Sequence, residues 1–141
     1  MTFDLLNDVN WGAVILAALA YFTLGAIWYA PPVLGNTWMA AAGTTMPEGQ
    51  RPSPAIYVIP LGGSLLSAIV LGMLAIATDT DTVSEGLVLG LVVAIGFALP
   101  IAIVTATFES TKPKPYVWGL INAGYHVLGS LIAAVIIALM A

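Results

Sequence analysis

The chain has 141 residues, of which 60% are hydrophobic and 7% charged, with three basic residues, seven acidic residues and no cysteine. Soluble domains carry about a quarter of their residues as charges, so this composition excludes a soluble globular protein. The absence of cysteine excludes disulfides, thiolate catalysis and cysteine metal sites, and three basic residues cannot form an electrostatic surface for nucleic acid.

The charged residues gather in short clusters and leave four long intervals without Asp, Glu, Lys or Arg, at 9–47, 52–78, 86–108 and 115–141. A hydrocarbon layer about 30 Å thick is crossed by roughly 20 apolar residues of helix, and each interval is long enough. Helix is expected because an isolated strand would leave backbone groups unpaired in lipid. The sequence therefore predicts an all-α integral membrane protein with a single domain, residues 1–141, and four transmembrane helices in an up-down-up-down bundle.

The four spans are predicted, in chain order, at about 11–30, 55–78, 84–107 and 116–140. Proline can begin or end a helix but disrupts its interior, and it lies at most of these boundaries: Pro31, Pro32, Pro52, Pro54, Pro113 and Pro115. The connection 31–54 is the longest, and its segment 35–42 is a candidate for a short interfacial helix. The short loop 79–83 predicts an antiparallel hairpin of the second and third spans.

The three basic residues predict the orientation, because Lys and Arg near span ends stay on the cytoplasmic side. Arg51 lies in the first connection, and Lys112 and Lys114 lie in the third, so both termini are expected outside the plasma membrane. The N-terminus lacks the basic residues of a cleaved signal, so the first span is expected to remain. Trp11 marks the expected outer boundary, and six further aromatic residues mark the inner one: Trp28, Tyr29, Trp38, Tyr57, Tyr116 and Trp118.

The third span carries a small residue at every fourth position, a pattern that lets two helix backbones approach closely in lipid. This helix-packing stripe consists of Gly86, Gly90, Ala94, Ala98, Ala102 and Ala106. A shorter stripe in the second span, Ser64, Ala68 and Gly72, indicates that the hairpin neighbour is the partner. The alternative is a thin-walled pore lined by the stripe. Pro100 is expected to kink this span.

His126, in the middle of the fourth span, is the residue type best suited to chemistry within the spans. Asn122, His126 and Ser130 are spaced four residues apart and form one polar stripe. We expect His126 to be buried in the bundle interior, neutral, and hydrogen-bonded to Asn122 or a tyrosine of the same depth, Tyr21 or Tyr125. The alternatives are a proton or solute pathway and axial ligation of a haem or chlorophyll-type tetrapyrrole. One histidine is too few for a zinc or di-iron site, so no metal site is expected. No other cofactor is expected in the leading interpretation.

The flanks of the two tyrosines resemble each other: Tyr21-Phe-Thr-Leu-Gly25-Ala in the first span and Tyr125-His-Val-Leu-Gly129-Ser in the fourth. The two spans run in opposite directions in the predicted bundle. Two interpretations stay open: an inverted repeat of the kind some transporters use, and a shared composition bias.

A set of residues spread over nearly the whole chain forms a recognisable pattern: Asn10-Trp11, Gly25, Trp28-Tyr29-Ala30-Pro31, Gly35, Trp38 and Asn122-Ala-Gly-Tyr125-His126. In these residues the chain resembles a bacterial membrane family catalogued as domain of unknown function 1761. Ala30 departs from the family pattern, which has Ser there. The resemblance implies a small four-span bacterial inner-membrane protein and no particular activity.

These observations favour a non-enzymatic membrane protein that acts by helix association, as a homo-oligomer or as an accessory subunit of a larger assembly. The spans contain no carboxylate pair, nucleophile–base pair or metal cluster that would indicate an enzyme. The first alternative is a small transporter or channel with a path past Asn122, His126, Tyr21 and Tyr125. A weaker alternative is a tetrapyrrole-binding subunit that uses His126.

Overall fold

The structure, a computed structural model, describes residues 2–45 and 53–141. Its helical elements are the 3-10 helix η1 (Phe3–Asn7), α1 (Trp11–Trp28), the π-helical turn η2 (Pro31–Gly35), α2 (Asn36–Ala42), α3 (Ala55–Ala77), α4 (Val83–Val93), the π-helical turn η3 (Ala94–Ala98), α5 (Leu99–Phe108) and α6 (Pro115–Leu139). No strand occurs in these described ranges. The predicted all-helical fold class is confirmed.

Four helical segments are long and apolar enough to cross a membrane: α1, α3, the continuous run from α4 through α5, and α6. Their ends lie within two residues of the boundaries expected from the sequence. The short helix expected at 35–42 corresponds to α2. Arg51 and Pro52 lie outside the described residues.

Polar side chains cap two of the spans at the end of the molecule that holds the termini. The Asn10 carboxamide oxygen accepts from the backbone N–H of Ala13 at 3.1 Å, and its NH₂ group donates to the Met140 carbonyl at 2.8 Å. At the start of α4, Thr82 and Glu85 form a reciprocal capping box. Asn10 therefore both begins α1 and joins it to the end of α6.

The third span continues through Pro100 without a break, because the helix widens just before it. A proline inside a helix removes one backbone donor and crowds the preceding turn. Here the turn Ala94–Ala98 is π-helical, and the N–H of Leu99 donates to the carbonyl of Ala94, five residues earlier. The irregularity expected at Pro100 is thus a π-helical turn, which is a recognised cause of helix bending.

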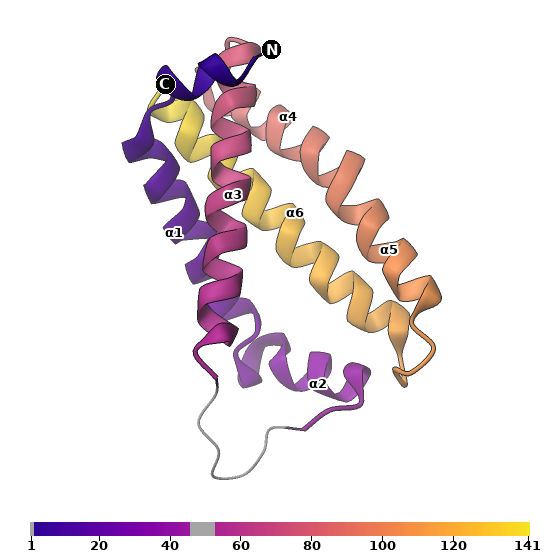
Figure 1. Ribbon diagram of the computed structural model, residues 1–141. Coiled ribbons are helices and arrows are strands. Elements are labelled where there is room, and N and C mark those ends of the chain that lie inside the picture. The colour runs from indigo at the N-terminus through magenta and orange to yellow at the C-terminus, as the bar shows by residue number, and fades with distance from the viewer. Residues whose placement is uncertain (1, 46–52) are drawn as a thin grey trace.

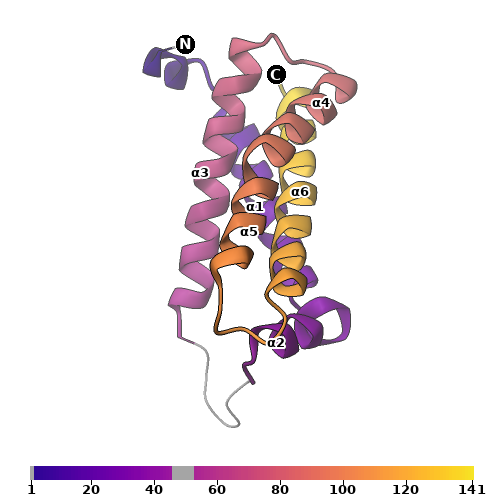
Figure 2. The same cartoon turned by 90° about the vertical axis from the view of Figure 1, so that its right-hand side faces the viewer.

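Helix α6 lies at the centre of the molecule and contacts α1, α3, α4 and α5 (Figures 1 and 2). Both termini lie at one end, and α2 lies at the other (Figure 1). Helix α6 runs antiparallel to the third span, since Gly86 meets Ala134 while Gly119 meets Ala106, and antiparallel to α1, since Gly25 meets Tyr125 while Gly129 meets Tyr21. The hairpin neighbours α3 and α4 have fewer contacts with each other than either has with its partners across the bundle.

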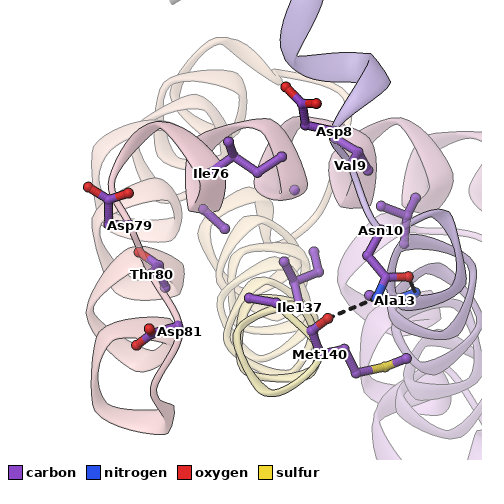
Figure 3. A pocket seen from close by; sticks show the side chains of 14 residues that line it. Asp8, Val9, Asn10, Ala13, Ile76, Asp79, Thr80, Asp81, Ile137 and Met140 are labelled. Atoms are coloured by element: carbon purple, nitrogen blue, oxygen red, sulfur yellow. Dashed lines mark hydrogen bonds between the residues drawn. The ribbon is translucent and has the colours of Figure 1, made fainter.

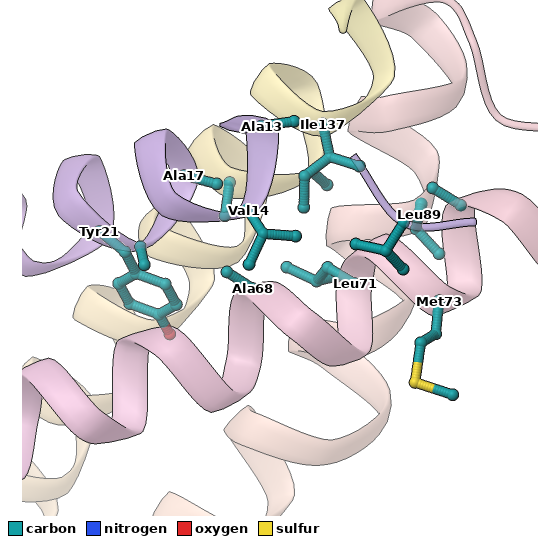
Figure 4. Packing of buried hydrophobic residues seen from close by; sticks show 14 of the residues in the cluster. Ala13, Val14, Ala17, Tyr21, Ala68, Leu71, Met73, Leu89 and Ile137 are labelled. Atoms are coloured by element: carbon teal, nitrogen blue, oxygen red, sulfur yellow. The ribbon is translucent and has the colours of Figure 1, made fainter. Parts of the chain in front are cut away.

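The hydrophobic core lies mostly in the half of the bundle nearest the termini and extends to Tyr21 and Tyr125 at mid-span; Figure 4 shows part of it. Its most completely buried large side chains are Val14 of α1 and Leu71 of α3, and small residues of three helices close around them: Ala13, Ala17, Ala68, Ala133 and Ala134. In the other half, every described residue from Ser53 to Gly63 is exposed. The bundle is therefore closed at the end with the termini and open along α3 toward the α2 end.

Candidate functional site

A cluster of polar and aromatic side chains joins α1, α2 and α6 between mid-span and the α2 end. We call it the tyrosine–histidine cluster, and its members are Tyr21, Tyr29, Trp38, Asn122, Tyr125 and His126. All except Tyr29 and Trp38 were singled out from the sequence for the polar network.

Asn122 is the member of this cluster that binds Tyr29 and Trp38. Its carboxamide oxygen accepts from the Tyr29 hydroxyl at 2.8 Å and from the Trp38 indole N–H at 2.9 Å. Trp28 also donates to α6, through a 3.0 Å bond to the Ile121 carbonyl. Three of the aromatics expected at the inner boundary thus use their polar groups on α6, whereas Tyr57 and Tyr116 are exposed.

His126 is bonded to a mid-span tyrosine but is not buried in the bundle interior as expected. The Tyr21 oxygen lies 2.8 Å from Nδ1 of His126 and 3.4 Å from the His126 carbonyl oxygen. Tyr21 is almost completely buried, whereas His126 is exposed. The prediction that His126 is buried is wrong, because the other helices cover α6 only partly at the level of His126.

Tyr21 and Tyr125 pack reciprocally between α1 and α6. A Cβ on Gly25 would lie 3.2 Å from the Tyr125 ring and hydroxyl, and a Cβ on Gly129 would overlap the Tyr21 ring. The two tyrosine rings contact each other, with centroids 5.3 Å apart. The similar Tyr-x-x-x-Gly segments are therefore antiparallel partners, in which each glycine makes room for the tyrosine of the other.

Ser130, the third member of the predicted polar stripe, lies at the seam between α6 and α4. It is buried, and its carbonyl oxygen would lie 2.9 Å from a Cβ on Gly90. The stripe is thus divided between an exposed His126 and a buried Ser130.

The small-residue stripe of the third span packs closely against a helix, but the partner expected from the sequence is wrong. A Cβ on Gly86 would lie 3.0 Å from α6 backbone atoms, and one on Gly90 would lie 2.8 Å from the Leu131 Cα. Ala94 and Ala106 are buried, and Ala98 and Ala102 are half-buried. The partner is α6 rather than α3. This contact also leaves no room for a pore along the stripe.

The second-span stripe is buried on the other side of the bundle. Ser64, Ala68 and Gly72 are all buried, and a Cβ on Gly72 would lie 3.3 Å from Val14 of α1. Both stripes mark close helix contacts, and neither marks a contact between the two hairpin neighbours.

Outside the tyrosine–histidine cluster, the acidic residues near the termini also line a depression. A depression of about 350 Å³ at the end with the termini has Asp8, Asp79 and Asp81 among its lining residues and lies apart from the tyrosine–histidine cluster (Figure 3). Within residues 2–45 and 53–141, no group of three or more His, Asp or Glu side chains is placed to hold a metal ion.

The residues that resemble the family pattern contact one another. Gly25 meets Tyr125, Trp28 meets Gly124, and a Cβ on Gly35 would overlap the Tyr29 carbonyl oxygen. Tyr29 and Trp38 converge on Asn122. The sequence offered Tyr29 and Trp38 only as interfacial aromatics. Tyr29, Trp38 and Asn122 all belong to the family pattern, and this shared membership is the signal that could have linked the two aromatic residues to Asn122.

Neither a curated protein nor a solved structure matches the chain. A family model described as "Protein of unknown function" matches residues 12–138, which include all four candidate spans except a single residue at each end. The chain therefore belongs to the DUF1761 family of proteins of unknown function.

Proposed function

We propose that this protein acts without catalysis, by helix association in a membrane, as a homo-oligomer or as an accessory subunit of a larger assembly. The observation that carries the proposal is the abrupt end of packing along one face of α3. Residues on that face follow 4-3 spacing, which is typical of helix–helix seams: Tyr57, Leu61, Ser64, Ala68, Leu71 and Ala75.

The last four of these side chains are packed, and the first two are not. Ser64 is 4% exposed and Ala68 0%, whereas Leu61 is 39% exposed and Tyr57 57%. The face that forms the core near the termini thus continues toward the α2 end, where Tyr57 and Leu61 are left exposed by residues 2–45 and 53–141. A helix of another chain would extend the seam without changing the fold.

The third span supports the same proposal. Only 17% of its most hydrophobic stretch is buried, less than in the other three spans. Its outer surface includes Val88, Val92 and Phe97, all well exposed. Acyl chains can cover such a surface, but so can a second helix, since association in lipid depends on close packing rather than on hydrophobicity.

Crosslinking at the unpaired α3 face tests the association. With no native cysteine, Leu61→Cys supplies a single thiol on that face, and Leu66→Cys supplies one on the opposite face of the same helix. We expect oxidation in membranes to give a dimer with Leu61→Cys and much less with Leu66→Cys, and a native mass in mild detergent above that of one chain.

The mass measurement separates the two forms of the proposal. One chain with a co-purifying membrane protein would favour the accessory role. One chain alone, together with equal crosslinking at both positions, would contradict association.

The proposed orientation places both termini outside a bacterial inner membrane and the loop before α6 in the cytoplasm. It rests on the loop between α5 and α6, which contains Lys112 and Lys114 and lies at the end opposite the termini (Figure 1). Lys112 also lies 4.7 Å above the Trp118 ring and 3.2 Å from Glu109. Such a snorkelling lysine beside an aromatic ring is typical of a membrane boundary.

Labelling of single cysteines at Thr2 and Thr111 tests this orientation, since both residues are exposed and belong to segments at opposite ends, the N-terminal segment and the loop between α5 and α6 (Figure 1). A membrane-impermeant maleimide added to intact spheroplasts is expected to modify Thr2→Cys, and to modify Thr111→Cys only after lysis. Modification of both from the same side would refute the four-span topology.

A small transporter is the second candidate, and the tyrosine–histidine cluster favours it. Hydrogen bonds join Trp38 and Tyr29 to Asn122, and ring contacts lead on from Tyr29 through Tyr125 to His126. Beyond this level Val14, Ala68 and Ala133 are fully buried, so a path would need α3 to move. Solute flux in proteoliposomes tests this candidate, and visible absorption of the purified protein tests a tetrapyrrole on His126.

A further inference from the structure

The seam between α1 and α3 is closed near the termini and open toward the α2 end. In the closed part, a Cβ on Gly72 of α3 would lie 3.3 Å from Val14 of α1. The two helices run in opposite directions (Figure 1). Counting the same number of residues from this contact, backward along α3 and forward along α1, brings Tyr57 to the level of Tyr29. The open part of α3 thus lies at the level of the tyrosine–histidine cluster.

Both helices lose burial at the same level of this seam. On α3, the exposed fraction of the residue rises from 4% at Ser64 to 39% at Leu61, within one helical turn. On α1, Tyr21 is 2% exposed, whereas Gly25 and Trp28, which continue the same face at helical spacing, are half-buried. The seam therefore opens from both sides near mid-span.

The turn of α3 where the packing ends also has a weakened backbone. Pro60 lies inside the helix and has no N–H, so one backbone hydrogen bond of the helix is missing there. Gly62 and Gly63 follow, and glycine lowers the stability of a helix more than any residue except proline. The Ser64 hydroxyl donates to the Pro60 carbonyl at 2.9 Å, a type of bond that often accompanies a bend in a helix.

The same turn has open space around it in the described part of the chain. A Cβ at Gly62 or at Gly63 would meet no atom within 4 Å, and every described residue of 53–63 is exposed. The next turns of α3, in contrast, are held in the core through Ala68 and Leu71 (Figure 4). Three properties therefore coincide at one turn: the end of the packing, a weakened backbone and space to move.

We propose that the first two turns of α3, Ala55–Leu61, form a hinged lid that moves about Gly62 and Gly63 and closes on α1. In the closed state Tyr57 and Leu61 extend the seam and cover the tyrosine–histidine cluster. The inference goes beyond the proposed association and does not depend on it. It concerns the same face, however, since closure withdraws Tyr57 and Leu61 from a partner helix.

Distances between two spin labels test the lid, because the chain has no native cysteine. Ile56→Cys on the lid and Ile27→Cys on α1 place the labels at exposed positions. Ile56 lies about 10 Å along the helix from Gly63, so a bend of about 20° displaces it by about 4 Å. In full-length protein in nanodiscs, diluted with unlabelled chains, we expect two distance populations, the second shorter by about that amount.

A matched pair of labels in the packed half provides the first control. Val70→Cys and Ile15→Cys lie on the same two helices and are also exposed. Because the core holds both helices at this level, we expect a single narrow distance population for this pair.

Substitution of the two glycines tests the hinge itself. In Gly62→Ala/Gly63→Ala the added methyl groups have room and stiffen the helix. The labels at Ile56 and Ile27 are therefore expected to keep only the longer distance. Gly96→Ala, which also has room but lies on the third span, is expected to leave both populations.

Three results would overturn the inference. They are a distribution as narrow as that of the control pair, a second population at longer distance only, and two populations that persist in Gly62→Ala/Gly63→Ala. The native mass of the same preparation tests the association separately. A single narrow distance in a dimer would contradict the lid alone, whereas two distances in a single chain would support the lid and count against the association alone.

Discussion

Gly90→Leu is expected to lower the free energy of unfolding by about 3 kcal/mol or to prevent stable folding in detergent. A Cβ at this position would already lie 2.8 Å from the Cα of Leu131 and 2.9 Å from the carbonyl oxygen of Ser130. Both are backbone atoms of α6, which cannot move aside as a flexible side chain can. A leucine would therefore force α4 and α6 apart along their closest contact.

Gly96 supplies a matched control on the same span, because a Cβ there would meet nothing within 4 Å. Gly96→Leu is expected to change thermal stability little, and Leu91→Ala, at an exposed position, should also be mild. Ala94→Leu should resemble Gly90→Leu, since Ala94 is fully buried. Equal unfolding temperatures for Gly90→Leu and Gly96→Leu would show that the seam does not form.

The fold class and the span boundaries were predictable because lipid imposes them. Charge-free intervals long enough to cross a bilayer indicate a lipid environment. Pro54, Pro113 and Pro115 mark where helices begin. Thr82 and Glu85 also form a readable capping signal. None of these signals depends on which helices contact each other, so they predict the span boundaries in any tertiary arrangement.

The helix partners were not predictable from the same patterns. A stripe such as Gly86 and Gly90 indicates that a backbone approaches closely, but every helix of this chain offers small residues. Adjacency in sequence favoured α3, whereas the contacts lie on α6. The central position of α6 is a property of the whole bundle, and no local pattern encodes it.

The candidate site was predicted in part. The bond between His126 and Tyr21 agrees with the expectation of a tyrosine partner, but the exposure of His126 does not. Exposure depends on which helices cover α6 at this level, and no local pattern on α6 encodes that. Trp38 could not be assigned to Asn122 because the direction of α2 depends on the turn at Pro31–Gly35.

Asn122→Leu is expected to release α2 from the bundle and to destabilise the protein by about 2–3 kcal/mol. The substitution removes the acceptor of both the Tyr29 hydroxyl and the Trp38 indole, and an unpaired donor that stays out of water costs about 1–3 kcal/mol. Hydrogen exchange is the measurement: the backbone amides of Asn36–Ala42 should exchange faster than in the unmodified chain, while those of α4 should not.

Trp38→Phe provides the comparison, because it removes one of the two bonds and leaves the acceptor to Tyr29. We expect a smaller loss of stability and partial release of α2, which remains attached through the bond from the Lys114 N–H to the Ala41 carbonyl at 3.1 Å. Since both substitutions break the same Trp38–Asn122 bond, the double variant should lose less stability than the sum of the two single changes. Strict additivity would mean that Trp38 and Asn122 do not interact, and α2 would then be held in place by its backbone contacts alone.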